Sequence, residues 1–584
     1  MTEPESKWAK SLSYALPIVI VAVSYIVCII HSGMLYLSND DTAIQNTLSG
    51  FLTGSPFPYH QFIHFLLSYP ISLLYRIIPT VQWWYLYDHI ILLFGGFLIN
   101  IMIYQAGRRN KASLLLSTIY AFLLDTAFLV YSIANVSYTI AAGIIGSGGI
   151  CLLLTVYENR RNQVSIEDRE IIFNSHVGYW VSGVCIILSV LTRQESGAVL
   201  LCYTLLVFFY LYIKQKEVVN ARNVFRFLSI VIILFVSYVV IGEINEWKQT
   251  QVNGTEWMEF NKARRDYTDY PHDSYKNNPE LFDSVGISKE TGTLMNNWCF
   301  MDKSITAENL RYIIANSKKE ARTLDVGILS ARWEKSQESR NLVACENVWI
   351  ILTGLALIMV ISGRKKEDIA ICLLNITGTI ILVFYQVVSG RIMYRSVIIC
   401  LIPSATISVF LLLQSTAFRE RKWILYVTTI IMTALCLRNI DTIKQITFNT
   451  DTITKQAEQR DREDMIYDYA SKHPENFYIR ENGLTYDRYP RKALKPECKN
   501  IIGWGGCDYN SRNYRNVLQN NGIKDVTGDV FKQSNVFLIT VGQMDEDDVF
   551  FKWLKAKYGA NGIVHIDNIC NDIGVCRFTF DKDT

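Results

Sequence analysis

The chain has 584 residues, of which 50% are hydrophobic and only 19% are charged, and its formal net charge is +3. Soluble domains average about 25% charged residues, and here the shortage is uneven, because long stretches carry almost no charge while two others are ordinary polar sequence. This pattern excludes a simple soluble protein and predicts a polytopic α-helical membrane protein with soluble insertions. The net charge is too small to indicate nucleic-acid binding, and there is no glycine-rich phosphate loop.

Hydropathy predicts about eleven membrane-spanning helices. The first apolar run is too long for a cleavable signal peptide, and no small-residue cleavage site follows it, so we expect it to remain as a span. The predicted spans are 13–37, 86–106, 112–132, 138–156, 178–192, 196–213, 224–242, 347–363, 368–389, 396–416 and 422–438.

Lysine and arginine concentrate in every second loop, which predicts the orientation of the chain. Because basic loops stay in the cytoplasm, we expect a cytoplasmic N-terminus and an extracytoplasmic C-terminal region in a bacterial inner membrane. The basic segments are Lys7 and Lys10, "GRRNK" (107–111), "NRRN" (159–162), "KQKEVVNARNVFR" (214–226), "GRKKED" (363–368) and "RERK" (419–422).

The apolar segment "HQFIHFLLSYPISLLYRIIP" (60–79) is not counted as a span, although its length would allow it. Counting it would move every later basic loop to the outside. The segment also contains two histidines, an arginine and two prolines. We therefore predict one or two helices that lie along the outer membrane surface.

Three regions then face outward, namely residues 38–85, the loop 243–345 and the tail. The tail alternates strand-like and helix-like segments, which predicts an extracytoplasmic α/β domain at 441–584 after a membrane domain at 1–440. No nucleophile elbow, metal motif or catalytic triad pattern is visible in it. Its predicted strands are "NFYIR", "NIIGW", "VFLITV", "GIVHI" and "VCRFTF", and its predicted helices are at about 511–520 and 544–557.

The 13 cysteines divide between the two environments. Seven lie in predicted spans, where cysteine acts as a small hydrophobic residue. The spacings 498/507 and 570/576 are compatible with local disulfides, and free thiols in a reducing environment are the alternative. The six cysteines in outward regions, where oxidation is permitted, are Cys299, Cys345, Cys498, Cys507, Cys570 and Cys576.

The predicted outer face collects acids, histidines and arginines from separate turns. The adjacent Asp40 and Asp41 follow the first span, and acids so close to hydrocarbon usually have a function. His60 and His64 are spaced i, i+4 and share one helix face. The complete candidate set is Asp40, Asp41, His60, His64, Asp88, His89, Arg193, Glu195, Arg391 and Arg395.

An acid beside phosphate-binding cations fits group transfer from a membrane-bound phospholipid donor. A carboxylate can act as general base on a hydroxyl, so Asp40 or Asp41 is the predicted base. Arginines can hold a phosphate bidentately and stabilise it as a leaving group, which is the role predicted for Arg193, Arg391 and Arg395. A sugar carried on a polyprenyl phosphate is the obvious donor, and the remaining candidates are predicted to bind substrate.

Each candidate also has a purely structural interpretation. Asp40 can be a polar residue at a helix end, and Asp41 can be the N-cap of a following helix. His60 and His64 can be interfacial residues whose hydrogen bonds are satisfied, and Asp88 and His89 can form a structural pair. Glu195 can pair with Arg193, and the other two arginines can extend to the membrane interface. We expect no cofactor, although the two aspartates with a histidine are also suitable ligands for a divalent metal.

The layout resembles the GT-C glycosyltransferase superfamily over about residues 12–440. "SNDDTAIQNTLSGF" matches the position of the catalytic acidic motif of that superfamily, "YHQFIHFLLSYPISLLY" resembles its following His/Pro segment, and "LTRQESG" is similar to its Thr–Lys/Arg turn. The loop 243–345 departs from the simplest GT-C pattern. "EFNKARRDYTDY" (259–270) and "GWGGCDYNSRNY" (503–514) also look like stretches of uncharacterised bacterial multi-pass proteins.

The resemblance implies a membrane enzyme that transfers a sugar from a polyprenyl-phosphate donor to a glycan, lipid or protein acceptor outside the cytosol. It favours Asp41 slightly as the base. The loop 243–345 would cover the site, and the tail would help to recognise the acceptor. Two alternatives remain, a lipid-linked glycan transporter or polymerase-like carrier and a membrane scaffold. Charges in mid-span are nearly absent, with Asp125 as one exception, which favours chemistry at the outer face over transport.

Overall fold

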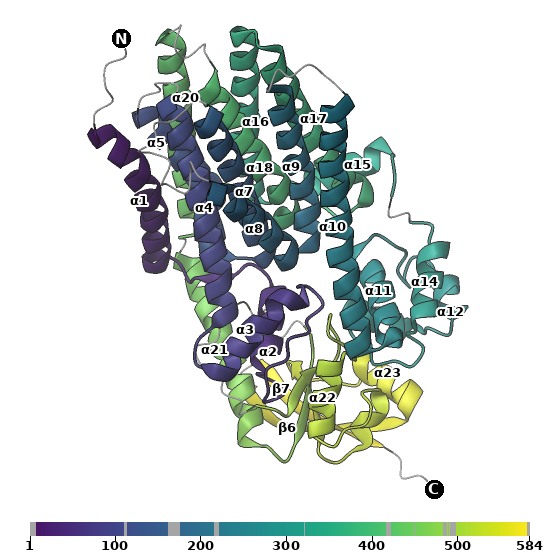
Figure 1. Ribbon diagram of the computed structural model, residues 1–584. Coiled ribbons are helices and arrows are strands. Elements are labelled where there is room, and N and C mark those ends of the chain that lie inside the picture. The colour runs from purple at the N-terminus through teal and green to yellow at the C-terminus, as the bar shows by residue number, and fades with distance from the viewer. Residues whose placement is uncertain are drawn as a thin grey trace.

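The computed structural model describes residues 7–109, 114–161, 176–214, 221–319, 322–415, 422–448, 450–482, 488, 490, 498–570 and 572–580. Long helices lie side by side in a bundle, and a smaller domain that contains the main sheet lies at one end of it (Figure 1). Parts of the predicted basic loops at 107–111, 159–162, 214–226 and 419–422 fall outside the described residues.

In the described part of the chain, 9 helical segments are long and apolar enough to cross a membrane. They are α1 (Lys7–His31, apolar from Ser11), α4 (Trp83–Arg109), the continuous run α5 (Leu114–Leu124), η1 (Asp125–Leu129) and α6 (Val130–Ala134), α7 (Tyr138–Arg161), α9 (Gln194–Lys214), α10 (Ala221–Asn253, apolar from Leu228), α16 (Arg340–Gly363, apolar from Asn341), α17 (Lys366–Ser389) and α18 (Tyr394–Gln414). The fifth and eleventh predicted spans correspond to the shorter apolar helix α8 (His176–Thr192) and to α20 (Lys422–Ile446). The predicted polytopic helical fold is confirmed.

The centre of the bundle is formed by α7, which is buried along its whole apolar window, and by α18. Small residues let α4 and α7 approach closely. A methyl group added at Gly95 would lie 2.6 Å from the Ile144 carbonyl oxygen, and one at Gly148 would lie 2.8 Å from the carbonyl oxygen of Gly95. By contrast, no residue in the apolar window of α10 is buried inside the protein, as expected of a helix that faces lipid.

The predicted surface segment contains the 13-residue helix α3 (Phe65–Ile77). A helix of this length rises about 20 Å, which is less than the roughly 30 Å of a hydrocarbon core. Leu66, Tyr69 and Leu73 are exposed along one side of it. The helix is therefore too short to span, as predicted.

A pair of two-residue strands fixes the start of the segment 38–85, which we call the first outer loop after its predicted location. β1 (Leu35–Tyr36) pairs in parallel with β2 (Asn135–Val136), and the Leu37 amide donates to the Val136 carbonyl oxygen at 2.7 Å. This pairing places the beginning of α2 (Asn39–Ser49) against the beginning of α7.

The helix α10 continues to Asn253, beyond the predicted end of the span at 242. The polar residues after 242 still form helix, because they pack against α11 (Thr255–Asp269) rather than entering solvent alone. The outer loop between α10 and α16 then forms five short helices. These are α11, α12 (Pro279–Asp283), α13 (Lys289–Asn296), α14 (Ala307–Asn316) and α15 (Val326–Ser336).

The C-terminal region folds as the predicted α/β domain, after the helix α21 (Thr450–Lys472). Its sheet has the order β4-β3-β5-β7-β6, in which β3 pairs in parallel with β4 and β5, while β7 is antiparallel to β5 and β6. All five predicted strands and both predicted helices are confirmed. Their bounds are β3 (Phe477–Arg480), β4 (Ile501–Gly503), α22 (Arg512–Asn520), β5 (Val536–Val541), α23 (Val549–Tyr558), β6 (Ala560–Cys570) and β7 (Ile573–Phe580), with the 3₁₀ turn η4 (Gly528–Lys532) before β5.

The outer loop packs against the C-terminal domain, where α13 contacts α23, and Figure 1 shows α11 lying next to this domain. Cys299 and Gly505 form an antiparallel bridge, and the Trp257 indole donates to the Tyr509 carbonyl oxygen at 2.9 Å. Each of the thirteen cysteines is a free thiol. The interpretation of 498/507 and 570/576 as disulfides is therefore wrong for this structure, and the free-thiol alternative holds.

Candidate functional site

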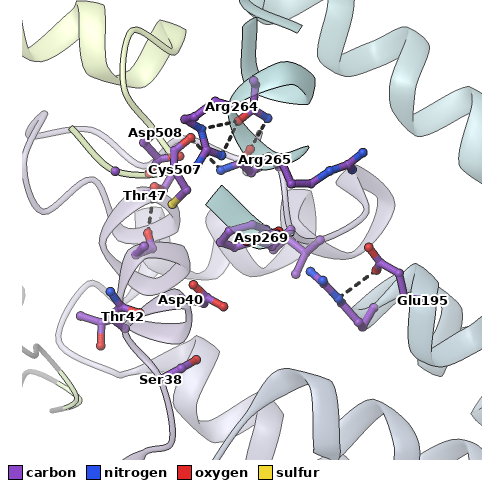
Figure 2. A pocket seen from close by; sticks show the side chains of 18 of the residues that line it. Ser38, Asp40, Thr42, Thr47, Glu195, Arg264, Arg265, Asp269, Cys507 and Asp508 are labelled. Carbon is purple, nitrogen blue, oxygen red and sulfur yellow. Dashed lines mark hydrogen bonds and ion pairs between the residues drawn. The ribbon is translucent and has the colours of Figure 1, made fainter. Parts of the chain in front are cut away.

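A cavity of about 1360 Å³ lies where the bundle meets the outer loop and the C-terminal domain. Its wall combines the first outer loop, the turns after α8 and α17, α10, α11 and the start of the C-terminal sheet. Figure 2 shows Asp40, Glu195, Arg264, Arg265 and Asp269 arranged around this space. Segments that are far apart in the sequence thus form the wall of one polar cavity.

Two adjacent acids occupy the first turn of α2, where negative charge is favourable because of the helix dipole. Ser38 is the N-cap residue, and its side chain makes no capping hydrogen bond. The interpretation of Asp41 as the N-cap is therefore wrong by position, since α2 begins at Asn39. Successive residues of a helix point about 100° apart, so the two carboxyl groups face different surroundings.

Asp40 lines the cavity. Its Oδ2 lies 2.7 Å from Arg395 Nη1, and the same guanidinium nitrogen donates to Ser38 Oγ at 2.9 Å. The side chains of Asp40 and Arg395 are 20% and 15% exposed. Arg395 comes from the start of α18, so this ion pair joins the first outer loop to the turn after the ninth predicted span.

Asp41 is fully buried and is not among the residues that line the cavity. The Tyr138 amide donates to its Oδ1 at 2.9 Å, and the Ser38 hydroxyl donates to its Oδ2 at 3.2 Å. Burial raises the pKa of the Asp41 carboxyl to about 8, and the neighbouring Asp40 adds to this rise, whereas the Tyr138 amide, Arg395 and Ser38 oppose it. Asp41 is thus a buried acid that holds the start of α2 against α7.

Two further predicted arginines line the cavity with acidic partners. Arg193 Nε lies 2.9 Å from Glu195 Oε2, and its Nη1 donates to the Tyr138 hydroxyl at 2.7 Å. Burial alone would lower the pKa of Arg193, but Tyr138 and Glu195 outweigh it and raise the pKa above its usual range. Arg391 Nη2 lies 2.8 Å from Asp269 Oδ2.

The predicted histidines have mainly structural contacts. His64 lines the cavity, but its Nδ1 accepts from the Leu66 amide as the N-cap of α3 and its Nε2 contacts the Ile241 carbonyl oxygen at 2.9 Å. His89 is buried, with its ring nitrogens 2.9 and 3.3 Å from the carbonyl oxygens of Tyr85 and Ile133. These contacts are structural, as the structural interpretation expects, while His64 also lines the cavity.

Asp88 and His60 are also absent from the cavity wall. Asp88 lies in α4, fully buried, and neither carboxylate oxygen has a hydrogen-bond partner among the described residues. His60 instead faces Cys507 and Asp508 in the C-terminal domain. Of the ten candidates, the cavity wall includes Asp40, His64, Arg193, Glu195, Arg391 and Arg395.

Several cavity residues were not predicted. Arg264, Arg265 and Asp269 belong to "EFNKARRDYTDY", and Cys507 and Asp508 belong to "GWGGCDYNSRNY". Both stretches were noted for their resemblance to other multi-pass proteins, which was the available signal. The sequence alone does not show that the fold brings both stretches to one cavity.

Arg264 is a buried cation in the cavity wall. Its Nε and Nη2 donate to Asn261 Oδ1 at 3.3 and 2.6 Å, and its guanidinium lies 5.6 Å from the centre of the Trp298 ring. It makes no ion pair with any acid in the described part of the chain, and burial lowers its pKa. This wall of the cavity is therefore suited to an anionic or strongly polar group.

A metal site made of Asp40, Asp41 and a histidine is not formed by the described residues, because Asp41 turns into the core. The candidate metal ligands that the described chain brings together are His60, Cys507 and Asp508.

No family model matches the chain, and neither does any curated protein. Among solved structures, the chain is similar to the crystal structure of ArnT from Cupriavidus metallidurans bound to undecaprenyl phosphate, at 11% identity and a TM-score of 0.36, over 96% of this chain and 97% of that one. The same protein in the apo state matches at 12% identity, with the same TM-score and coverage. This likeness assigns no role to any residue.

Proposed function

We propose that the chain is a membrane glycosyltransferase of GT-C type, which transfers a sugar from a polyprenyl-phosphate donor to an acceptor outside the cytosol. One observation carries the proposal. Asp40, an acid at the outer end of a helix bundle, lines the same large cavity as Arg193, Arg391 and Arg395. A base and phosphate-binding cations are the groups that this reaction requires.

Asp40 is the proposed general base. It would accept the proton of an acceptor hydroxyl as that oxygen bonds to the anomeric carbon of the sugar. The bond between this carbon and the phosphate oxygen breaks in the same step, and polyprenyl phosphate leaves with the electron pair. Arg395 orients the carboxylate for this role, and Ser38 in turn accepts a hydrogen bond from the same guanidinium. Asp41 is disfavoured as the base because its buried carboxyl already accepts two protein hydrogen bonds.

The arginines are the proposed site for the donor phosphate. A guanidinium carries five N–H donors. In the described part of the chain each of the three arginines pairs with one acid, so donors remain for phosphate oxygens. Arg193 lies directly after α8, Arg391 lies in the turn after α17 and Arg395 lies at the start of α18, and all three line the same cavity. A phosphate could therefore bind there while its polyprenyl chain stays in the bilayer.

The acceptor would bind against the part of the cavity wall that α11 and the C-terminal domain supply. This part of the wall carries a cationic side chain, Arg264, and an acidic one, Asp508. The proposed location is a bacterial inner membrane with the cavity on the extracytoplasmic side. The described ends of the basic loops support this, because Lys214 pairs with Glu158 at the end of α7 that is remote from the cavity.

The test compares two adjacent substitutions in an assay of transfer from a labelled polyprenyl-phosphate sugar. Asp40→Asn keeps the size and polarity of the side chain but cannot take the proton, so kcat should fall about 10²–10⁴-fold. Asp41→Asn should keep most of the activity, since Asp41 does not line the cavity. Full activity of Asp40→Asn, with unfolding temperature unchanged, would remove Asp40 from the reaction.

One observation favours the carrier alternative. Asp125 lies in the π-helical turn η1 within a span, buried, and Asn100 Nδ2 donates to both of its carboxylate oxygens at 3.2 and 3.3 Å. Such turns are frequent at functional sites, and buried acids in spans often mark transport pathways. Movement of an unaltered lipid-linked glycan across liposomes, lost in Asp125→Asn but not in Asp40→Asn, would favour the carrier.

A further inference from the structure

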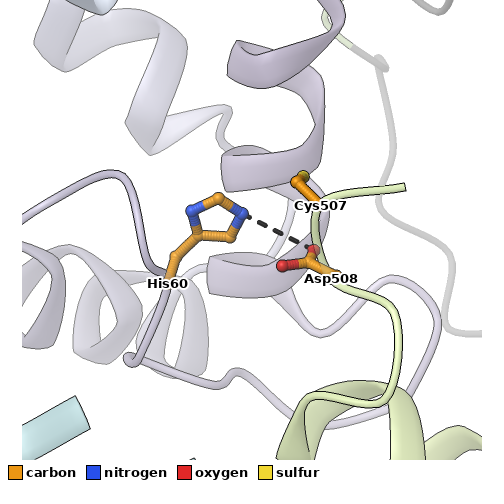
Figure 3. A group of neighbouring side chains, drawn as sticks. All are labelled: His60, Cys507 and Asp508. Carbon is orange, nitrogen blue, oxygen red and sulfur yellow. Dashed lines mark ion pairs between the residues drawn. The ribbon is translucent and has the colours of Figure 1, made fainter. Parts of the chain in front are cut away.

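Three side chains with metal-binding atoms meet at the interface between the first outer loop and the C-terminal domain (Figure 3). His60 comes from the loop before α3, and Cys507 and Asp508 follow β4 in the C-terminal domain. Their ligand atoms all lie within 4.8 Å of one another, and His60 Nε2 is 3.6 Å from Asp508 Oδ2. A nitrogen, a sulfur and an oxygen donor thus converge from two parts of the chain.

The His60 ring supplies a second and independent observation. The residue is 1% exposed, and its Nε2 has no hydrogen-bond partner although it is shielded from solvent. The distance of 3.6 Å to Asp508 is too long for a hydrogen bond. A buried polar atom without a partner is costly and requires an explanation, and an ion between these groups is one.

The surroundings hold this cluster in place from outside. Gln61 Nε2 donates to the Cys507 carbonyl oxygen at 2.8 Å, and Gln249 Nε2 donates to the His60 carbonyl oxygen at 3.1 Å. The Asn261 amide in turn donates to Gln61 Oε1. These hydrogen bonds hold the main chain at His60 and Cys507, and so fix the positions from which the two side chains extend.

We propose that His60, Cys507 and Asp508 bind a thiophilic divalent cation of the zinc class. Zinc takes imidazole, thiolate and carboxylate ligands at about 2.0–2.3 Å in tetrahedral geometry. Ligand atoms of such a site are about 3.5 Å apart, so the three groups need only close slightly. The anionic thiolate and carboxylate would neutralise the ion, which suits a site near the buried Arg264 (Figure 2).

Binding through Nε2 requires the ring proton to sit on Nδ1. In this structure Nδ1 accepts a long hydrogen bond of 3.3 Å from the Phe62 amide. This weak contact would open when the ion binds, and the ring would turn slightly toward Asp508. Because Cys507 and Asp508 also line the cavity, the fourth coordination position would be open to water or to a substrate oxygen.

The ion would act as a clamp between the first outer loop and the C-terminal domain. His60 lies 447 positions before Cys507 in the sequence, so the ion would join two segments that are distant in the chain. The site does not include Asp40 or Arg395, and the proposal stands whether or not the chain transfers sugars.

The test uses the full-length protein purified in detergent, stripped with a chelator and then titrated with Zn²⁺ or Co²⁺. We expect one tightly bound zinc ion per chain and, with cobalt, a thiolate-to-metal charge-transfer band in the near ultraviolet. Cys507→Ser should abolish the band and weaken zinc binding by more than about 100-fold, beyond the usual effect of an outer-shell residue. Cys570→Ser is the matched control, because this half-buried thiol of the same domain contacts Asp572 instead.

A chain that binds less than one zinc ion, or that shows no thiolate band with cobalt, would overturn the proposal. Equal zinc affinity in wild type and Cys507→Ser would do the same. If Cys507→Ser does not fold, Asp508→Asn and the thermal unfolding of the wild type decide the question. Zinc should raise the unfolding temperature of the wild type and of Cys570→Ser, and the absence of any such rise would count against the site.

Discussion

Replacing Asp41 with Asn should stabilise the folded chain at neutral pH while leaving transfer activity largely intact. Burial raises the pKa of the Asp41 carboxyl from its ordinary 3.8 to about 8. At 1.36 kcal/mol per pKa unit, the folded chain holds this proton roughly 5–6 kcal/mol more tightly than the unfolded chain does. Asn cannot ionise, and its side-chain oxygen can still accept from the Tyr138 amide.

The pH range in which Asp41 lowers stability follows from its protonation in the folded and in the unfolded chain. Below about pH 4 the carboxyl is protonated in both states, and its full stabilising contribution is present. Between about pH 4 and pH 8 only the folded chain keeps the proton, so this contribution is lost as the pH rises, by roughly 4 kcal/mol at pH 7. Asp41→Asn should therefore gain stability over the wild type as the pH rises through this window.

Thermal unfolding of both proteins in one detergent, at several pH values from 5 to 8, measures the effect. The difference in Tm, mutant minus wild type, should be positive and should grow with pH. Asp41→Ala is the control, because it leaves the Tyr138 amide buried without an acceptor, at a cost of about 1–3 kcal/mol. A difference that does not change with pH, or that shrinks toward pH 8, would refute the raised pKa of Asp41.

Three further predictions concern the donor site, the topology and the domain interface. Arg391→Ala should raise KM for a lipid-phosphate donor about 10- to 150-fold, since a charge-assisted hydrogen bond contributes about 1.5–3 kcal/mol, and unchanged donor kinetics would exclude it from the site. Cysteine introduced at Lys555 should react with an impermeant reagent on intact cells, and cysteine at Lys365 should not; the reverse labelling would invert the topology. Gly505→Ala should lower Tm and increase proteolysis at the interface, because a methyl group there would lie 1.6 Å from a carbonyl oxygen of the outer loop. Gly354→Ala, with nothing within 4 Å of the added methyl group, should leave both unchanged.

The helices and strands could be predicted because their signals are local. Long apolar runs indicate spans and short alternating runs indicate strands, so every predicted span and strand has a counterpart in the described residues. The end of α10 was missed for a physical reason. Hydropathy marks where a chain leaves the hydrocarbon, near residue 242, whereas the helix ends at Asn253, where its hydrogen-bonded pattern stops.

The candidate site was predictable only in part. The arginines at the turns after α8 and α17 were found, since basic residues at the turns between predicted spans are visible in the sequence. Arg264 and Cys507 were missed, because their position depends on contacts between distant segments. The hydrogen bond from Gln61 to Cys507 joins residues 446 positions apart, and no local pattern encodes it.

The two adjacent acids show most clearly what three-dimensional structure adds. In sequence, Asp40 and Asp41 are equivalent candidates, and the family resemblance slightly favours Asp41. In the fold, one helical step separates a carboxylate that faces the cavity and Arg395 from a carboxyl that is enclosed between α2 and α7. Because its pKa is raised to about 8, Asp41 keeps its proton at neutral pH, which spares the cavity a second negative charge beside Asp40. A phosphate donor is then repelled less, and the arginines remain effective as its binding site, so the buried acid supports the proposed chemistry without taking part in it.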